Sequence, residues 1–327
     1  MLILLGCSLF GPEKEPRETG IDPFTTDETD TDADSDADTD ADTDTDTDTD
    51  TDADTDTDTT PTEPSVCARW NADRADVTEA TWSGNVGSCD PGDMDAAGRA
   101  RALTVLNLYR YLAGLPEVTA NTGANDDAQS CALMMHANNT LSHDPPTSWT
   151  CYDSAGADAA GNSNIASGPA VMAMDMYMQD WGNETTIGHR RWILSNQLGP
   201  VGIGSTSRYS CLKVIGGSGS AGADWQAWPP PGDFPYEAVS AGGYLTLDET
   251  GWTLQSDRID LSRASVTVTD GGSNKAMTVD QLLQYYGSTY AIKMTPRGWA
   301  SEVGHTYRVE VTGVSPTISY EVTMVGC

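Results

Sequence analysis

Apolar residues recur at helical intervals between residues 95 and 113, so that they would share one face of a helix. The positions at this spacing are Leu103, Leu106, Tyr109 or Arg110, and Leu112. Gly114 and Pro116 come directly after this segment, and both are typical of a helix end. The pattern therefore predicts a helix over 95–113.

The following segments continue this pattern and then change to strands. The predicted helices are 126–139, 169–180 with Pro169 in its first turn, and 188–194, and the predicted strands are 201–204 and 211–215. Helices that come first and strands that come after them indicate a layered α+β domain.

The C-terminal hundred residues alternate apolar and polar side chains instead. The alternation over 307–311 and 318–324 predicts half-buried antiparallel strands. A hairpin is predicted between 264–269 and 276–279, around Asp270-Gly271-Gly272. We therefore expect a small all-β, immunoglobulin-like sandwich over 223–327.

A segment rich in tryptophan and proline, residues 225–236, precedes these strands. It is interpreted as a connector packed against the helical domain. The alternative is a polyproline-type ligand for another protein.

Acidic residues are concentrated near the N-terminus. Of the 49 Asp and Glu residues, 22 lie in residues 8–66, and the formal net charge of the chain is −32. This Asp- and Thr-rich segment has too few apolar residues to offset the entropy of folding, so it is predicted to be a disordered linker. It lacks the glycine and terminal glutamate of a calcium-binding EF-hand loop. The excess of negative charge also argues against a nucleic-acid partner.

Residues 1–7 are a short apolar run that ends in Gly6 and Cys7. They resemble the end of a bacterial lipoprotein signal peptide, which implies lipidation of Cys7 and anchoring to a membrane. Ser8 after the cysteine favours the outer membrane. We expect an extracytoplasmic protein, either an outer-membrane lipoprotein or a secreted one.

Six further cysteines are spread over the rest of the chain without any CxxC pair. They are Cys67, Cys89, Cys131, Cys151, Cys211 and Cys327. An even set of this kind predicts three disulfides and an oxidising compartment. Proximity in the sequence suggests the pairs Cys67–Cys89, Cys131–Cys151 and Cys211–Cys327.

The order of several motifs resembles the CAP superfamily of cysteine-rich secretory proteins, venom antigens and plant pathogenesis-related proteins, in a bacterial branch. The motifs are Asn107 with Tyr109-Arg110, Gly114-Leu115-Pro116, Leu141-Ser142-His143, Asn164-Ile165-Ala166, Gly188-His189-Arg190 and Val201-Gly202-Ile203-Gly204. The resemblance implies a CAP-type α/β/α sandwich, which we place at 67–222.

The same resemblance implies a cleft with two histidines and two acids that binds a divalent metal in some members. His143 and His189 match the histidines, and Asn164 follows the position of the first acid, where this chain has Ser163. The second acid matches Asp180, with Glu184 as the nearest alternative. His143 and His189 are therefore the candidate ligands for zinc or another divalent metal. We predict no catalytic residue, because the set of acids is incomplete.

Other chemistries find little support in the sequence. It contains no G-x-S-x-G and no H-E-x-x-H motif, and the glycine-rich segment 216–222 lacks the lysine of a phosphate-binding loop. Arg190 and Arg191 are candidates for clamping an anion, although a structural role is more common. Three hypotheses stay open: recognition of a lipid, sterol-like or cell-wall ligand, metal-dependent hydrolysis, and a structural adhesin.

Overall fold

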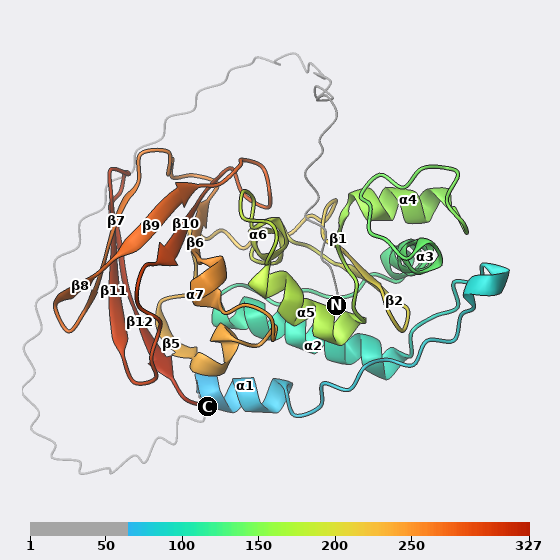
Figure 1. The fold of residues 1–327 in the computed structure, drawn as a ribbon, viewed down its shortest axis with the longest axis horizontal. Helices are drawn as coiled ribbons and strands as arrows, with labels where there is room; N and C mark the ends of the chain where they lie inside the picture. Colours follow the sequence, from blue (N-terminus) through green and yellow to red (C-terminus); the bar gives the residue numbers. More distant parts are fainter. Residues whose placement is uncertain (1–64) are drawn as a thin grey trace, which may run out of the picture. The chain divides into compact units, whose positions relative to one another are not determined.

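The computed structural model describes residues 65–327, and Figure 1 shows the arrangement of their helices and strands. The predicted signal segment with Cys7 and the predicted linker up to residue 64 lie outside the described residues. The helices of the first half are α1 (Val66–Asp73), α2 (Ala96–Leu112), α3 (Thr122–Asn138), α4 (Ser154–Gly161), α5 (Ala170–Gln179) and α6 (Gly188–Ile193), with the short 3₁₀ helix η1 (Val86–Ser88). The strands are β1 (Ser163–Ala166), β2 (Gly202–Ser205) and β3 (Ser210–Lys213).

Side-chain caps set the starts of the two longest helices. Asp95 accepts a hydrogen bond from the amide of Gly98 at 2.7 Å, and Asn121 accepts one from the amide of Ala124 at 3.0 Å. The four predicted helices are confirmed as α2, α3, α5 and α6. Helix α3 begins four residues before its predicted start, because the Asn121 cap precedes the apolar pattern.

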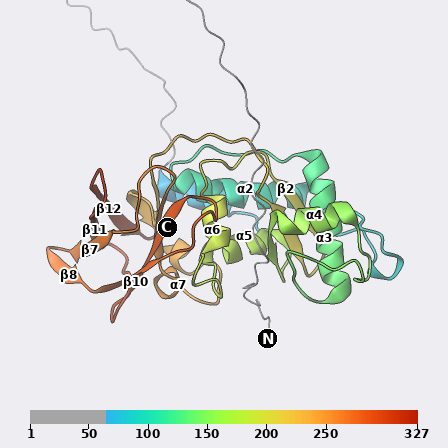
Figure 2. The same ribbon diagram turned by 90° about the horizontal axis from the view of Figure 1, so that it is seen from above.

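The small antiparallel sheet has the order β1-β3-β2 and lies between two layers of helices. Ile203 and Leu212 belong to one hydrophobic cluster with residues of α2 and α5. Ile165 and Cys211 belong to another cluster with α3 and α4. Because neighbouring side chains of a strand point to opposite faces, β3 contacts both layers. Figures 1 and 2 show α3 and α4 on one side of the sheet and α2 and α5 on the other, which is an α/β/α sandwich.

The C-terminal half is built mainly from strands. One sheet has the order β4 (Gln226–Trp228), β6 (Trp252–Ser256), β10 (Tyr290–Pro296) and β9 (Met277–Gln281). The other has the order β5 (Gly232–Pro235), β12 (Ile318–Val325), β11 (Thr306–Thr312), β7 (Ser265–Asp270) and β8 (Ser273–Lys275). The short helices η2 (Tyr236–Val239) and α7 (Leu247–Thr250) connect them.

Aromatic rings join the facing sides of these two sheets. The ring of Trp252 lies 5.7 Å from that of Tyr307, and the ring of Trp228 lies 4.9 Å from that of Phe234. The chain is therefore an α+β protein in which a β-sandwich follows the α/β/α layers. The predicted antiparallel pairing of 307–311 with 318–324 is confirmed as β11 and β12, while β5 pairs in parallel with β12.

Two local predictions in this half are wrong in part. The turn after Asp270 does join two strands, but the partner of β7 is β8, and residues 277–281 pair with β10 of the other sheet. The predicted connector 225–236 instead supplies β4 to one sheet and β5 to the other. Trp228 is fully buried between them, so this segment is no exposed polyproline ligand.

Contacts between the two halves are extensive. The hydrophobic cluster of α2 and α5 continues into the β-sandwich, where the ring of Tyr109 lies 5.6 Å from that of Trp228. Arg190 donates to the carbonyl oxygen of Gly251 at 2.6 Å, and Arg191 donates to that of Ser288 at 3.0 Å. Both arginines are buried and bonded to protein oxygens, so they hold the halves together. The predicted boundary at residues 222 and 223 stays a prediction.

All six cysteines of the described residues form disulfides, but the predicted pairing is wrong. The pairs are Cys67–Cys327, Cys89–Cys151 and Cys131–Cys211. Cys131 of α3 bonds to the strand beneath it rather than to its nearest cysteine in the sequence, because tertiary packing decides the pairing. Three disulfides indicate an oxidising, extracytoplasmic environment. Among residues 65–327, no helix is long and apolar enough to span a membrane.

Candidate functional site

The candidate site lies where the loop after α3, strand β1 and the turn between α5 and α6 come together. His143 is on the loop, Ser163 and Asn164 are on β1, and His189 is in the first turn of α6. Asp180 ends α5 in a left-handed conformation with φ of 53°, and Ile187 precedes α6 with φ of 43°. These two residues reverse the chain, which brings Asp180 back to His189.

Asp180 forms a closely bonded pair with His189. The Nδ1 atom of His189 lies 2.9 Å from Oδ1 of Asp180. Asn183 donates to the same oxygen at 2.7 Å, and the amide of Arg190 donates to Oδ2 at 3.2 Å. Burial alone would raise the pKa of Asp180, but His189, Asn183 and Arg190 outweigh it and lower the pKa below its ordinary value. Asp180 is therefore a buried, ionised carboxylate.

Further contacts hold His189 in place. Its ring lies 5.2 Å from the ring of Tyr177, and its carbonyl oxygen accepts a hydrogen bond from Asn164 at 3.0 Å. The side-chain nitrogen of Asn183 also lies 3.2 Å from the Nδ1 atom of His189. Asn164 thus positions the backbone of His189.

His143 is oriented in a similar way from the other side. Its Nδ1 atom lies 2.8 Å from the carbonyl oxygen of Ala160. A carbonyl can only accept, so Nδ1 carries the proton and Nε2 is left with the lone pair. Burial lowers the pKa of His143, and the charge of His189 lowers it further against the opposing bond to Ala160. His143 is therefore neutral at neutral pH and lies within electrostatic reach of His189.

Ser163 is one of the buried residues of this region whose side chain has no hydrogen-bond partner. Its side chain is 5% exposed, and its Oγ atom has no partner among residues 65–327. An acid at this position would bring a second carboxylate to the site. A serine brings a neutral hydroxyl instead.

Comparison with known families gives one match, over the centre of the chain. Residues 103–215 match the model of the cysteine-rich secretory protein family, CAP. Residues 103–215 are a CAP domain. No curated protein and no solved structure matches the chain. The matched range contains all five residues of the candidate site.

The CAP domain offers few ligands for a metal. A catalytic zinc site needs about three protein ligands, and a structural one about four. The carboxylate of Asp180 is already bonded to three partners and is 2% exposed, so it supports His189 rather than adding a ligand. Glu184 is exposed on the turn. Within residues 65–327, no group of three or more His, Cys, Asp or Glu could hold a metal ion. The residues present do not fit a zinc site.

Two contributors were missed from the sequence. Asn183 and Tyr177 touch Asp180 and His189 but lie outside the CAP motifs quoted above. The position of Asn183 on the short turn between Asp180 and His189 is the feature of the sequence that could have identified it. The other two histidines lie elsewhere: His136 lies between the rings of Trp82 and Tyr209, and His305 pairs with an aspartate of the β-sandwich.

Proposed function

We propose that this chain is an envelope-anchored recognition protein whose CAP domain binds a small apolar, lipid or cell-wall ligand. The observation that carries the proposal is the state of the two acid positions. Asp180 is bonded on both carboxylate oxygens, and Ser163 occupies the other acid position. Among residues 65–327, neither of these two acid positions then offers a free carboxylate to the histidines for acid–base catalysis. The lipid anchor at Cys7 and the acidic linker are part of the same proposal.

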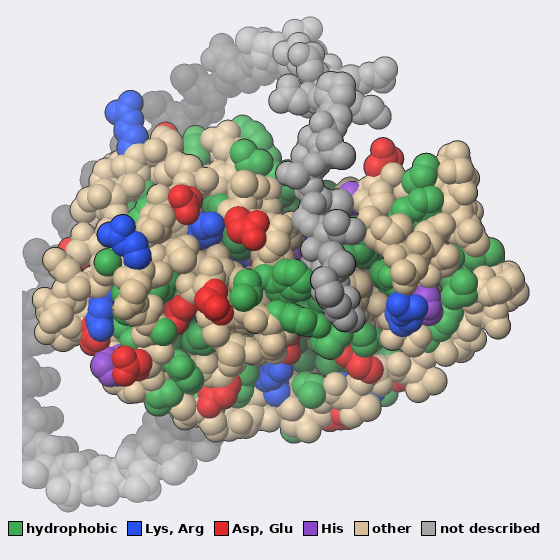
Figure 3. Space-filling model, viewed as in Figure 1, with side chains coloured by type: hydrophobic (Ala, Val, Ile, Leu, Met, Phe, Trp, Pro, Cys, Tyr) green, Lys and Arg blue, Asp and Glu red, His purple; other side chains and the backbone are tan. Residues whose placement is uncertain are grey.

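Apolar side chains beside the site support an apolar ligand. Trp181 directly follows Asp180, and its ring lies 5.4 Å from that of Tyr244, which is 51% exposed beside the exposed Leu245. Leu283 and Tyr285 are also exposed, on a loop that contacts the same turn through the bond from the amide of Leu283 to Thr185. Figure 3 shows hydrophobic side chains gathered at the centre of this face. Large exposed apolar groups of this kind mark binding surfaces.

Arg191 gives the second of these loops a fixed position. It donates to the carbonyl oxygens of Leu283 at 2.7 Å and Ser288 at 3.0 Å, and so holds both ends of the loop against α6. Tyr285, 73% exposed, lies between these ends. A surface held in this way loses little entropy when a ligand binds.

The proposal is tested with Nile red, an uncharged apolar dye, added to the full oxidised chain. We expect saturable binding of the dye, with an affinity that falls by about thirtyfold in the double variant Tyr244→Ser/Tyr285→Ser, since each of the two exposed rings contributes on the order of 1 kcal/mol. Tyr152→Ser is the control, because Tyr152 is also exposed, at 37%, but lies before α4. Equal binding by all three proteins, or no binding by the wild type, would exclude an apolar site here.

A metal-dependent hydrolase is the second candidate, and one observation favours it. Both His143 and His189 bond an oxygen through Nδ1, which is how metal-binding histidines are usually oriented. Calorimetric titration of the full chain with zinc tests it, beside His143→Ala with His189→Ala. We expect no stoichiometric binding by either protein. Stoichiometric binding that the double variant loses would favour the hydrolase.

A further inference from the structure

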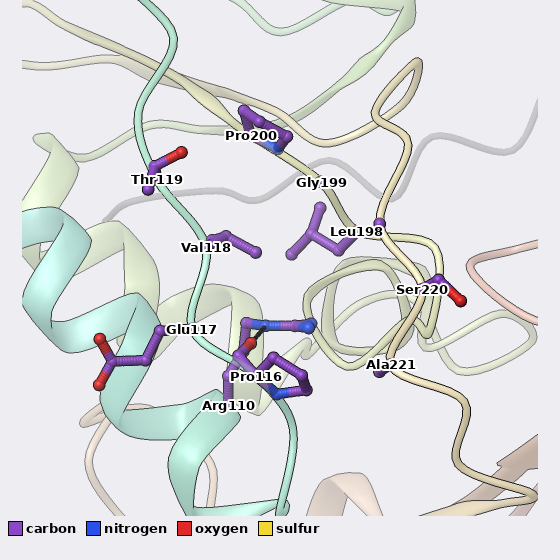
Figure 4. Close-up of a pocket in the computed structure, with 11 residues that line it drawn as sticks. Arg110, Pro116, Glu117, Val118, Thr119, Leu198, Gly199, Pro200, Ser220 and Ala221 are labelled. Carbon is purple, nitrogen blue, oxygen red and sulfur yellow. Dashed lines mark hydrogen bonds between the residues drawn. The ribbon is translucent and has the colours of Figure 1, made fainter.

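A pocket of about 190 Å³ lies apart from the histidines, and Figure 4 shows the residues that line it. Its walls come from the end of α2 and from three loops: Arg110, Pro116 to Thr119, Leu198 to Pro200, and Gly219 to Ala221. None of the five candidate-site residues is among them. The pocket therefore calls for its own explanation.

Arg110 supplies the only positive charge among the lining residues. Its side chain is 1% exposed, and it donates to the carbonyl oxygens of Pro116 at 2.7 Å, Ile193 at 2.7 Å and Ser195 at 3.1 Å. These bonds use Nε and Nη1. Within residues 65–327, Nη2 has no hydrogen bond and Arg110 has no ion pair. Burial lowers the pKa of Arg110 to about 10, and no acidic group of the described residues counters this effect.

The one acid of the pocket does not neutralise this charge. Glu117 lies at the rim and pairs with Arg69 at 2.5 Å. In Figure 4 its carboxylate points away from the other lining side chains. Arg110 therefore remains a buried cation beside an open space, and an anion in that space would be stabilised.

The glycine-rich segment 216–222 forms the opposite wall. A Cβ atom on Gly219 would lie 2.0 Å from the carbonyl oxygen of Leu198, so only glycine allows this close approach. The amides of Gly219 and Ala221 donate to Gln197 and Asn196 and fix the wall in place. This segment contains no lysine, and the positive charge that lines the pocket with it comes from Arg110 of α2.

We propose that this pocket binds a small organic carboxylate. The Nη2 donor of Arg110, which its bonds to carbonyl oxygens leave over, can form a charged hydrogen bond with one carboxylate oxygen, and Val118, Leu198 and Pro116 offer apolar contacts to a short aliphatic chain. At roughly 30 Å³ for each water-sized group, the volume holds about six non-hydrogen atoms. That is the size of butyrate.

Ligand-observed saturation-transfer NMR on the full oxidised chain tests the proposal, with butyrate and its uncharged analogue 1-butanol as probes at neutral pH. We expect the titrated signal to show that butyrate binds at least about tenfold more tightly than 1-butanol, because a charged hydrogen bond contributes about 1.5–3 kcal/mol. Equal affinity for the two probes, or no transfer to butyrate, would overturn the proposal.

Two variants test the location. Arg110→Lys keeps the charge but removes the Nη2 donor, and should weaken butyrate binding by about tenfold. Since this change could also disturb folding, Thr119→Trp narrows the rim and leaves Arg110 intact. The matched control is Ser218→Trp, on an exposed neighbouring position that does not line the pocket. Butyrate binding that survives Thr119→Trp unchanged would place the site elsewhere and refute the assignment.

Discussion

Replacement of Asp180 by asparagine tests whether this carboxylate supports the site as the structure indicates. The change keeps the shape of the side chain and removes its charge. The amide can accept at one end only, and at the other it presents N–H groups to a donor. The bonds at risk are those from His189 at 2.9 Å, Asn183 at 2.7 Å and the amide of Arg190 at 3.2 Å.

The expected loss of stability follows from these contacts. Hydrogen bonds to a charged group contribute about 1.5–3 kcal/mol each, and the breakage of a buried charge network costs about 3–5 kcal/mol. The asparagine retains part of the bonding. We therefore expect Asp180→Asn to lower the free energy of unfolding by about 3 kcal/mol at neutral pH.

The effect should depend on pH with a definite sign. The pKa of Asp180 is lowered in the folded protein, so its contribution is present above the ordinary pKa of aspartate, about 3.9, and is lost as the pH falls below it. The difference between wild type and Asp180→Asn should then be largest at pH 7 and should narrow below about pH 4.

Urea unfolding of both oxidised proteins at several pH values measures this difference. Asp127→Asn is the control, because Asp127 pairs with Lys213 at 3.1 Å near the surface, where an ion pair contributes at most about 1 kcal/mol. A variant at Asp180 that stays within about 0.5 kcal/mol of wild type at pH 7 would refute the reasoning, since that is the range of an ordinary surface substitution.

The remaining predictions concern packing. Arg190→Met should lower the free energy of unfolding by about 4 kcal/mol, because the buried carbonyl oxygens of the two halves lose their donor, whereas Arg258→Met, at an exposed pair, should cost less than about 1 kcal/mol. Urea unfolding distinguishes them, and equal losses would contradict the role of Arg190. Gly204→Ala should destabilise by about 3 kcal/mol or more, since its Cβ atom would lie 2.2 Å from the backbone of Ala128 in α3. Gly123→Ala, with 3.6 Å to its nearest neighbour, should be neutral or stabilise by about 0.5–1 kcal/mol, and a thermal melt of each variant checks the contrast.

The sequence predicted the elements whose signals are local. The apolar spacing of α2 and the glycine and proline after it define that helix without reference to any other part of the chain. Strand β1 was not predicted, because Ser163–Ala166 is short and begins with two polar residues. Its strand character comes from pairing with β3 on one edge. The hairpin signal at Asp270 was read correctly as a turn, but a turn signal cannot show that the following segment crosses to the other sheet.

The candidate site, like the fold, could be predicted from the sequence only in part. Motif order identified His143, Asn164, Asp180 and His189, and the structure brings the acid and the second histidine together. The chemical role of Asp180 could not be predicted, because it depends on two left-handed residues, Asp180 itself and Ile187. Neither is a glycine, so no residue type in the sequence indicates a reversal there.

The charges of the site and of the pocket show what each region can do. At the histidines, the one buried acid is bonded to its own neighbours, so the region offers oriented side chains beside exposed aromatic rings. At the pocket, the one buried cation has only carbonyl oxygens as partners, so an anion would gain a charged contact there. A ligand with an apolar body suits the first region, and a small carboxylate suits the second. The two binding assays use an uncharged dye and a short carboxylate for this reason, so that each result refers to one region.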